Sequence, residues 1–162
     1  YVYHIPSRTG NKLSLDAFEA IAGIEGVAGV KDTSGDVPWL GQVLADNPDL
    51  TVLAGHNALL YAGLELGCVG VVSSVSNAFP ELVVDLYDAF DDGDEDRAQE
   101  LQETVRDVVN AFDRGPYMAG AKTALAERDV DFDPGPLRDP LRTMDDAETA
   151  AFVDDLASIG LL

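Results

Sequence analysis

The sequence predicts an α/β fold in which helices cover a parallel sheet. Along residues 1–90, short apolar runs alternate four times with amphipathic stretches of helical period. The apolar runs are continuous, which is typical of parallel strands buried on both faces. Beyond this region the helical patterns continue without strands. We therefore expect four βα units in residues 1–92 and a C-terminal helical extension in residues 93–162.

The four βα units can be assigned element by element. Strands are predicted at residues 1–6, 27–33, 50–56 and 69–76, and helices at residues 14–24, 37–47, 58–67 and 77–90. Ser14 and Asp36 are the expected N-caps of the first two helices, and Pro38 lies in a first turn, where proline is tolerated. Eight such units close a barrel, so four form either an open sheet or half of a barrel.

The C-terminal part of the chain is predicted to be helical. Helices are expected at residues 97–112, 115–129 and 145–160, after an acidic turn at residues 91–96. Residues 131–141 contain prolines at positions 134, 136 and 140, and they are expected to form an extended connector. These elements lengthen the chain without adding a strand to the sheet.

The composition indicates a soluble and strongly acidic protein. Hydrophobic residues make up 46% of the chain, but no apolar run reaches the roughly 18 residues that span a membrane, so we expect a cytoplasmic protein without membrane contact. Thirty acidic and ten basic residues give a net charge of −20. This charge repels phosphate backbones, so nucleic acid is not an expected partner. The aliphatic content is too high for disorder, and the acidity favours a halophilic protein.

Lysine is rare in this chain, and one lysine stands in an unusual place. Only Lys12, Lys31 and Lys122 are present, and Lys31 directly follows the apolar run 27–30. Such a lysine can extend to solvent from the strand end or pair with Asp32. It can also act as a nucleophile, because burial among apolar side chains lowers the pKa of an amine. The local residues leave both interpretations open.

Cysteine and histidine give no sign of a disulfide or a metal site. Cys68 is the only cysteine, so no intrachain disulfide is expected, in keeping with a reducing compartment. His4 and His56 are far apart in the sequence and lack neighbouring ligands at the spacing that zinc requires. We therefore expect no metal ion.

Five segments resemble, in order and spacing, the dihydrodipicolinate synthase and N-acetylneuraminate lyase family of pyruvate-dependent Schiff-base aldolases. They are YHIPSRTG (3–10), GVKDTSGD (29–36), LAGHNALL (53–60), GVVSSVSNAFPE (70–81) and LRDPLRTM (137–144). The resemblance implies a TIM (β/α)8 barrel, of which the sequence covers the C-terminal four βα units plus a C-terminal helical extension. The strands that carry the family's Gly-Thr-Thr-Gly-Glu loop have no counterpart, so we expect the active unit to be a complete barrel. His4 stands where most members have Asn.

The resemblance implies roles for three residues at the first two strands. Lys31 matches the lysine that forms the imine with pyruvate, and Tyr3 matches the tyrosine that shuttles protons during imine formation and C–C cleavage. Arg8 matches an arginine that binds a substrate carboxylate in dihydrodipicolinate synthases. The alternative for Arg8 is a surface ion pair with one of the many acidic residues.

The resemblance also implies substrate contacts from the last two strands. Gly55 and Val72 match positions whose backbones line the pyruvyl pocket, and His56 and Asn57 stand where sugar acid aldolases contact substrate hydroxyls. Ser73 is expected to bind substrate in the same way, and Ser74 and Ser76 are further candidates. Small residues on a last barrel strand are also ordinary in packing.

The acceptor aldehyde differs among the branches of this family. Segment 115–125 lacks the Asn-Pro-x-Pro-x-Lys pattern of dihydrodipicolinate synthases, so reversible cleavage of a 2-keto-3-deoxy sugar acid to pyruvate and an aldehyde is the preferred function. Arg8 favours the alternative, a synthase that condenses pyruvate with aspartate semialdehyde. A non-catalytic barrel homologue or assembly module is the alternative of another class. The imine chemistry needs no cofactor, and a homotetramer is expected because family members commonly form one.

The acidic surface makes stability depend on salt. We expect the melting temperature to fall as KCl is lowered from about 1 M to ~0.1 M, because like charges repel once screening is lost. Thermal unfolding followed by circular dichroism across a KCl series measures this dependence. A melting temperature that does not change with KCl would contradict a halophilic protein.

Overall fold

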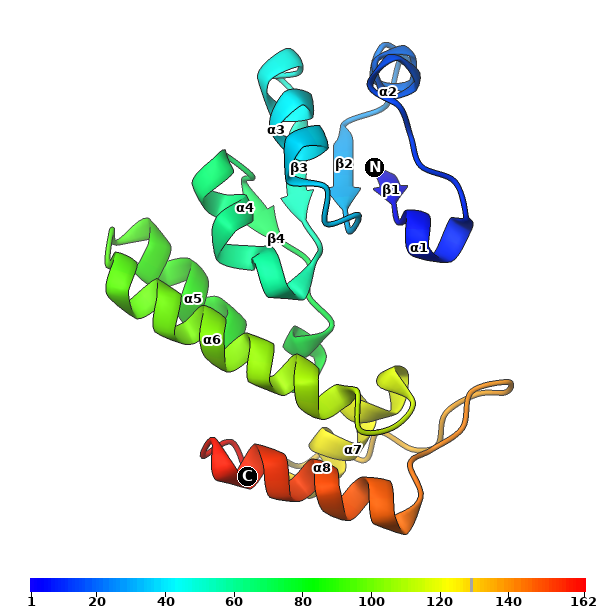
Figure 1. Ribbon diagram of the computed structural model, residues 1–162, viewed down its shortest axis with the longest axis vertical. Coiled ribbons are helices and arrows are strands. Elements are labelled where there is room, and N and C mark those ends of the chain that lie inside the picture. Colours follow the sequence, from blue (N-terminus) through cyan, green and yellow to red (C-terminus); the bar gives the residue numbers. More distant parts are fainter. Residues whose placement is uncertain (129) are drawn as a thin grey trace.

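The computed structural model describes residues 1–128 and 130–162, and Figure 1 shows their arrangement. Its centre is a four-stranded parallel sheet in the order β1-β2-β3-β4. The strands are β1 (Val2–His4), β2 (Gly29–Asp32), β3 (Thr51–Ala54) and β4 (Gly70–Val71). Each strand pairs with the next one in the sequence, and a helix connects them, as parallel pairing requires. The predicted parallel sheet is confirmed.

The predicted helices are confirmed, with small differences at their ends. Four follow the strands: α2 (Leu15–Ala22), α3 (Val37–Asp46), α4 (Leu60–Leu66) and α5 (Pro80–Asp91). Three more complete the chain: α6 (Glu95–Phe112), α7 (Tyr117–Glu127) and α8 (Asp146–Ser158). Residue 129, the last of the predicted helix 115–129, lies outside the described residues. None of the described helices is long and apolar enough to cross a membrane.

Side chains start the first two of these helices as the sequence predicts. The Ser14 hydroxyl accepts a hydrogen bond from the backbone N–H of Ala17 at 3.1 Å. The Asp36 carboxylate accepts one from the backbone N–H of Trp39, also at 3.1 Å. Each cap satisfies one N–H group that has no partner within its helix.

All four observed strands are shorter than predicted, and two of the predicted strands end in helical turns. The strand predicted at 1–6 ends at His4, and Pro6–Thr9 form a short helix, α1, with the proline in its first turn. The strand predicted at 69–76 ends at Val71, and Val75–Asn77 form a 3-10 helix, η2. The Ser73 hydroxyl accepts from the N–H of Val75 at 3.0 Å, so a side chain replaces the ladder there. A second 3-10 helix, η1 (Asn57–Leu59), leads into α4.

Two hydrophobic cores hold these elements together. The first lies between the sheet and the helices α2 and α3, and α3 and α4 cover the same face of the sheet in Figure 1. Its buried members are Phe18, Val30, Trp39, Leu40, Val43, Val52, Ala54 and Cys68. The second joins α4 and α5 to α6, α7 and α8, and includes Leu86, Val105, Phe112, Phe152 and Leu156. The division of the chain at residues 92 and 93 stays a prediction.

The other face of the sheet is open. On this face Tyr1, Tyr3 and Val72 lie at or next to the outer strands β1 and β4, and they are 69%, 51% and 43% exposed. Among the described residues, β1 and β4 each pair with one strand only. An apolar face with two unpaired edges is the geometry of a sheet that continues into further strands.

The contact between β2 and β3 leaves no room for a side chain at Gly29. A Cβ atom built there would overlap the backbone carbonyl oxygen of Thr51, so any larger residue must push the strands apart. We expect Gly29→Ala to lower the free energy of unfolding by about 1–3 kcal/mol. Chemical denaturation followed by circular dichroism measures the change.

The matched control is Gly41→Ala in the middle of α3. A Cβ at Gly41 has no heavy atom within 4 Å, so alanine is expected to stabilise the helix by up to about 1 kcal/mol. Equal effects of the two substitutions would show that the close approach of β2 and β3 does not limit stability.

Candidate active site

Tyr3 and Lys31 lie side by side on the open face of the sheet. They are register partners in the β1–β2 pair, so their side chains point to the same face. The Lys31 Nζ atom lies 4.0 Å from the centre of the Tyr3 ring. Lys31 is half-buried, whereas the neighbouring Val30 and Asp32 face the helices and are buried. The lysine therefore points away from Asp32, which accepts hydrogen bonds from His4 and Ser34.

Gly55, at the end of β3, makes space for the Lys31 side chain. A Cβ atom at position 55 would come within 2.5 Å of Lys31 Cε and 2.9 Å of the Asp32 carbonyl oxygen. The Gly55 N–H donates to that same carbonyl at 2.7 Å, which holds the loop against β2. Any side chain at this position would displace the lysine.

The surroundings of Tyr3 favour loss of its proton. Burial alone raises the pKa of the Tyr3 hydroxyl. The proximity of the Lys31 and Thr33 side chains, together with nearby positive charge, outweighs burial and lowers the pKa from its ordinary value of 10.0. A tyrosine with a lowered pKa beside an amine is suited to proton transfer.

All eight residues predicted for the site line one open cavity of about 610 Å³ at the C-terminal ends of the strands. They are Tyr3, Arg8, Lys31, Gly55, His56, Asn57, Val72 and Ser73. Ser74, a further candidate, lines it too, whereas Ser76 lines a different hollow and donates its hydroxyl hydrogen bond to the Ser73 carbonyl. The structure thus brings the predicted residues together, while their individual roles stay predictions.

Arg8 lies in α1 at the rim of this cavity, and its side chain is exposed. Within residues 1–128 and 130–162, the ion pairs do not include Arg8. A guanidinium at the mouth is therefore available for an anionic group of a ligand.

The sequence analysis missed cavity residues that the helical extension contributes. Tyr117, at the start of α7, lines the cavity together with Met118 and with Val109 of α6. The Tyr117 hydroxyl lies 2.8 Å from the Ser74 hydroxyl and 2.8 Å from Asn57 Nδ2, which also donates to Ser74 at 2.7 Å. The periodic pattern of segment 115–125 carries no signal for this contact.

The same extension holds the loop after β3 through a second contact. The side chain of Gln102 in α6 donates to the Asn57 carbonyl at 3.0 Å and accepts from the Tyr61 N–H at 2.9 Å. The Asn57 side-chain oxygen is buried and has no hydrogen-bond partner in the described part of the chain, and the same holds for the Thr33 hydroxyl. Both residues line the cavity, but these two atoms are enclosed within its wall.

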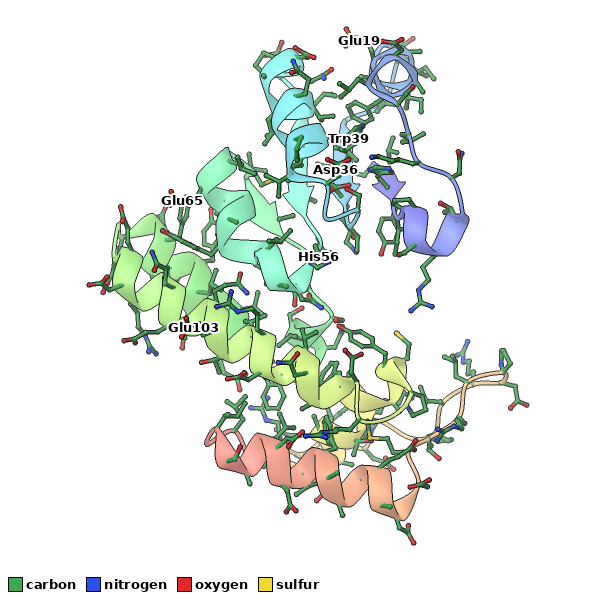
Figure 2. The ribbon with its side chains drawn as sticks, viewed as in Figure 1. Glu19, Asp36, Trp39, His56, Glu65 and Glu103 are labelled. Atoms are coloured by element: carbon green, nitrogen blue, oxygen red, sulfur yellow. The ribbon has the colours of Figure 1, made fainter. Side chains whose placement is uncertain are left out.

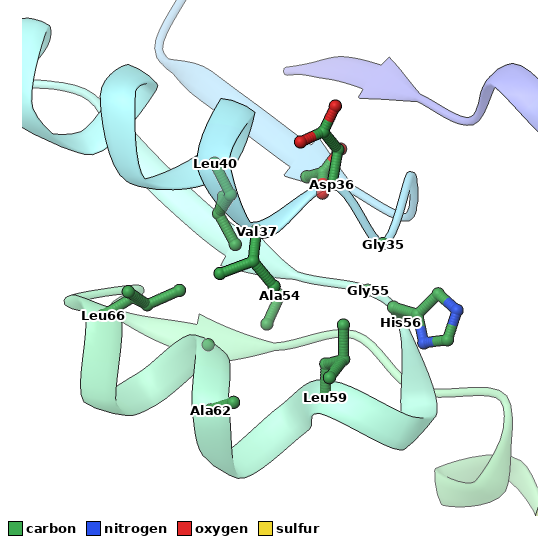
Figure 3. A pocket seen from close by; sticks show the side chains of 12 residues that line it. Gly35, Asp36, Val37, Leu40, Ala54, Gly55, His56, Leu59, Ala62 and Leu66 are labelled. Atoms are coloured by element: carbon green, nitrogen blue, oxygen red, sulfur yellow. The ribbon is translucent and has the colours of Figure 1, made fainter.

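A second, smaller cavity of about 20 Å³ lies between α3 and α4 (Figure 3). Its wall is largely aliphatic and carries neither Tyr3 nor Lys31. The labelled side chains there include Val37, Leu40, Ala54, Leu59, Ala62 and Leu66, with His56 at the end nearest the larger cavity. Its chemistry offers no nucleophile, so we do not place the site there.

Other reactive groups do not compete with Lys31. Burial raises the pKa of the Cys68 thiol to about 11, so this thiol is protonated at neutral pH. Among the described residues, no group of three or more His, Cys, Asp or Glu side chains is arranged to hold a metal ion.

Comparison with known proteins places this arrangement in a family. Residues 1–159 match the model of the "Dihydrodipicolinate synthetase family". The chain is 58% identical, over all of its 162 residues and 53% of the relative, to a protein of Halobacterium salinarum named as an uncharacterized DapA-like lyase. It spans about half the length of the curated relatives it matches.

Solved structures show the same fold. A dihydrodipicolinate synthase of Bacillus anthracis superimposes with a TM-score of 0.88 at 26% identity, over 96% of this chain and 53% of that one. A variant of the 2-keto-3-deoxygluconate aldolase of Sulfolobus solfataricus does so with a TM-score of 0.88 at 24% identity, over 98% of this chain and 53% of that one. The fold corresponds to half of these (β/α)8 barrels, and the match over residues 1–159 shows that the chain belongs to the dihydrodipicolinate synthetase family.

Proposed function

We propose that the protein is a pyruvate-dependent Schiff-base aldolase in which Lys31 is the nucleophile. One observation carries the proposal: the Lys31 amine lies 4.0 Å from the Tyr3 ring, in a cavity lined by every predicted site residue. Family membership supports the reaction class, and the whole protein's activity belongs to the proposal because the chain spans half of its relatives.

The proposed reaction begins with imine formation. The neutral Lys31 amine attacks the C2 carbonyl carbon of the keto acid, and the carbinolamine then loses water to give a protonated imine. Tyr3 relays a proton from the attacking amine to the carbonyl oxygen and then gives its own proton to the departing hydroxyl, which leaves as water. Tyr3 is left as a phenolate, a state that its lowered pKa favours. No external oxidant or reductant is consumed.

Cleavage then uses the imine as the electron acceptor. The C3–C4 bond breaks as its electron pair moves toward the iminium nitrogen, while Tyr3 takes the proton of the C4 hydroxyl, which becomes the aldehyde. Tyr3 passes this proton to C3 of the resulting enamine, which restores the iminium, and water then releases pyruvate from Lys31 by the reverse of imine formation. Every step is reversible, so the same site catalyses condensation.

We propose a 2-keto-3-deoxy sugar acid as the substrate. Asn57, Ser74 and Tyr117 contribute hydroxyl and amide groups to the cavity wall, where they bond one another. A sugar acid carries several hydroxyls that could bind these groups. Gly55 and Val72 are proposed to line the pyruvyl end, and His56 and Ser73 to contact hydroxyls.

Arg8 supports the second candidate, a dihydrodipicolinate synthase. Its exposed guanidinium at the cavity rim fits the carboxylate of aspartate semialdehyde. A non-catalytic homologue is the candidate of another class. A homotetramer, a cytoplasmic location and adaptation to high salt also belong to the proposal, and the net charge of −20 supports the last of these.

Trapping with pyruvate and sodium borohydride tests the nucleophile. Borohydride reduces the imine to a stable amine, so we expect the intact protein to gain the mass of one reduced pyruvyl group, on the peptide that contains Lys31. Lys31→Arg should abolish labelling, whereas Lys122→Arg, which changes another of the three lysines, should not. Labelling that persists in Lys31→Arg, or that never occurs in the intact protein, would refute an imine at this residue.

Product assays identify the acceptor. We expect pyruvate and glyceraldehyde to be released from 2-keto-3-deoxygluconate, and no consumption of pyruvate with aspartate semialdehyde. The opposite result, with a KM for aspartate semialdehyde that rises about tenfold or more in Arg8→Gln, would identify the synthase. An imine without turnover of either substrate would point to a different aldehyde.

A further inference from the structure

A buried histidine and aspartate pair lies directly behind Tyr3 and Lys31. His4 and Asp32 are register partners in the β1–β2 pair, one position beyond Tyr3 and Lys31. Because side chains alternate, this second pair points to the opposite face, toward the helices. The two residues are 1% and 3% exposed, and His4 Nδ1 lies 2.8 Å from Asp32 Oδ1.

The hydrogen bonds assign the protons of this pair. The backbone N–H of Leu13 donates to His4 Nε2 at 3.3 Å, so that nitrogen is an acceptor. His4 Nδ1 therefore carries the hydrogen and donates it to the Asp32 carboxylate, which leaves a neutral imidazole beside a charged carboxylate. Both ring nitrogens are used within the protein.

The contacts continue from Asp32 into a closed ring. The Asp32 carboxylate accepts from the Ser34 hydroxyl at 3.0 Å and from the Ser34 N–H at 3.2 Å. The Ser34 hydroxyl accepts from the N–H of Asp36 at 3.0 Å. The Asp36 carboxylate pairs with Lys12 at 2.5 Å, and Lys12 is next to Leu13 in the chain. We call these six residues the His4 ring: His4, Lys12, Leu13, Asp32, Ser34 and Asp36.

The aromatic side chain of Trp39 closes the space around the imidazole. The centres of the Trp39 and His4 rings are 4.2 Å apart, and Phe18 packs against the indole at 5.5 Å. Trp39 and Asp36 are labelled in Figure 2, at the start of α3 beside β1 and β2. Packing thus leaves the imidazole a single orientation.

The His4 ring joins the two loops that form one side of the candidate site. Arg8 lies in the segment between His4 and Leu13, and Thr33 lies between Asp32 and Ser34. Both Arg8 and Thr33 line the cavity. A shift of His4 would therefore move cavity residues in both loops, although His4 does not itself line the cavity.

The position of the short strand β1 depends on its contacts with β2, which include the hydrogen bond between His4 and Asp32. β1 has three residues and, among the described elements, pairs only with β2. Tyr3 belongs to this short edge strand, and Lys31 belongs to β2. The relative position of their side chains thus depends on whatever holds β1 against β2.

We propose that His4 is a positioning residue for the aldolase reaction: through Asp32 and Leu13 it holds Tyr3 in place against Lys31. The inference rests on the proposed imine chemistry. It predicts that loss of the imidazole slows imine formation through Tyr3, and not only by lowering the stability of the fold.

Four single variants of the intact protein, and the double variant that combines His4→Ala with Tyr3→Phe, test this role. His4→Ala removes the pair, whereas His4→Asn keeps an amide N–H that can donate to Asp32. Val43→Ala is the matched control, because Val43 is 1% exposed in the same core but belongs neither to the His4 ring nor to the cavity. Tyr3→Phe removes the hydroxyl through which His4 is proposed to act.

The first readout is the rate constant of imine formation at saturating pyruvate. It is measured by quenching samples with borohydride at successive times. We expect His4→Ala to slow it roughly ten- to a hundredfold, His4→Asn to recover most of the loss, and Val43→Ala to leave it unchanged. In the Tyr3→Phe background His4→Ala should have little further effect. Equal slowing by His4→Ala and Val43→Ala, or effects that multiply with Tyr3→Phe, would overturn the proposal.

The second readout is the pKa of the Tyr3 hydroxyl, and its measurement needs no pyruvate. It is obtained by pH titration from the ultraviolet difference spectrum between each protein and its Tyr3→Phe counterpart. Lys31 contributes to the lowered pKa of Tyr3, so displacement of Tyr3 in His4→Ala should raise that pKa toward 10.0. Val43→Ala should leave the pKa unchanged. If the unmodified protein traps no pyruvate, the proposed function fails, and this titration still decides whether His4 positions Tyr3. His4→Asn should keep the pKa close to that of the unmodified protein, and an unchanged pKa in His4→Ala would refute the positioning role.

Discussion

The parallel register of β1 and β2 is the constraint on which the rest of the structure depends. It sets Tyr3 beside Lys31 on the open face and, one residue later, His4 beside Asp32 on the face covered by helices. Because side chains alternate along a strand, the two pairs lie on opposite faces of the sheet: the Tyr3–Lys31 pair lines the cavity, and the His4–Asp32 pair is buried. The register of β2 with β3 adds Gly55, whose missing side chain leaves the space that Lys31 occupies.

The helical extension is part of the site and not only an appendage to the sheet. Gln102 of α6 and Tyr117 of α7 both contact Asn57, in the loop after β3. The core shared by α4 to α8 keeps these helices in place against that loop. The cavity therefore has one wall from the strand ends and another from the extension, and its shape depends on how the two parts pack.

Much of this arrangement is visible in the sequence, and the exceptions have physical causes. Continuous apolar runs and the caps Ser14 and Asp36 predict the order of strands and helices, because burial and local hydrogen bonds determine both. The position of Lys31 in a lysine-poor chain and the family's motifs predict the residues that line the cavity.

The end of β4 is not predictable from hydropathy, because the Ser73 hydroxyl bonds the backbone locally. Tyr117 and the contact between His4 and Asp32 join residues 43 and 28 positions from their partners, and no periodic pattern reports such distances along the chain.

The triangle of Asn57, Ser74 and Tyr117 has a consequence for how such a protein can change over time. Its third member comes from a helix outside the sheet, and Tyr3 and Lys31 do not touch it through any described hydrogen bond. Replacements in α7 can therefore alter the polar groups of the cavity wall without moving Tyr3 or Lys31. Under the proposed function, substitutions in α7 can change substrate preference over evolutionary time without any change at Lys31.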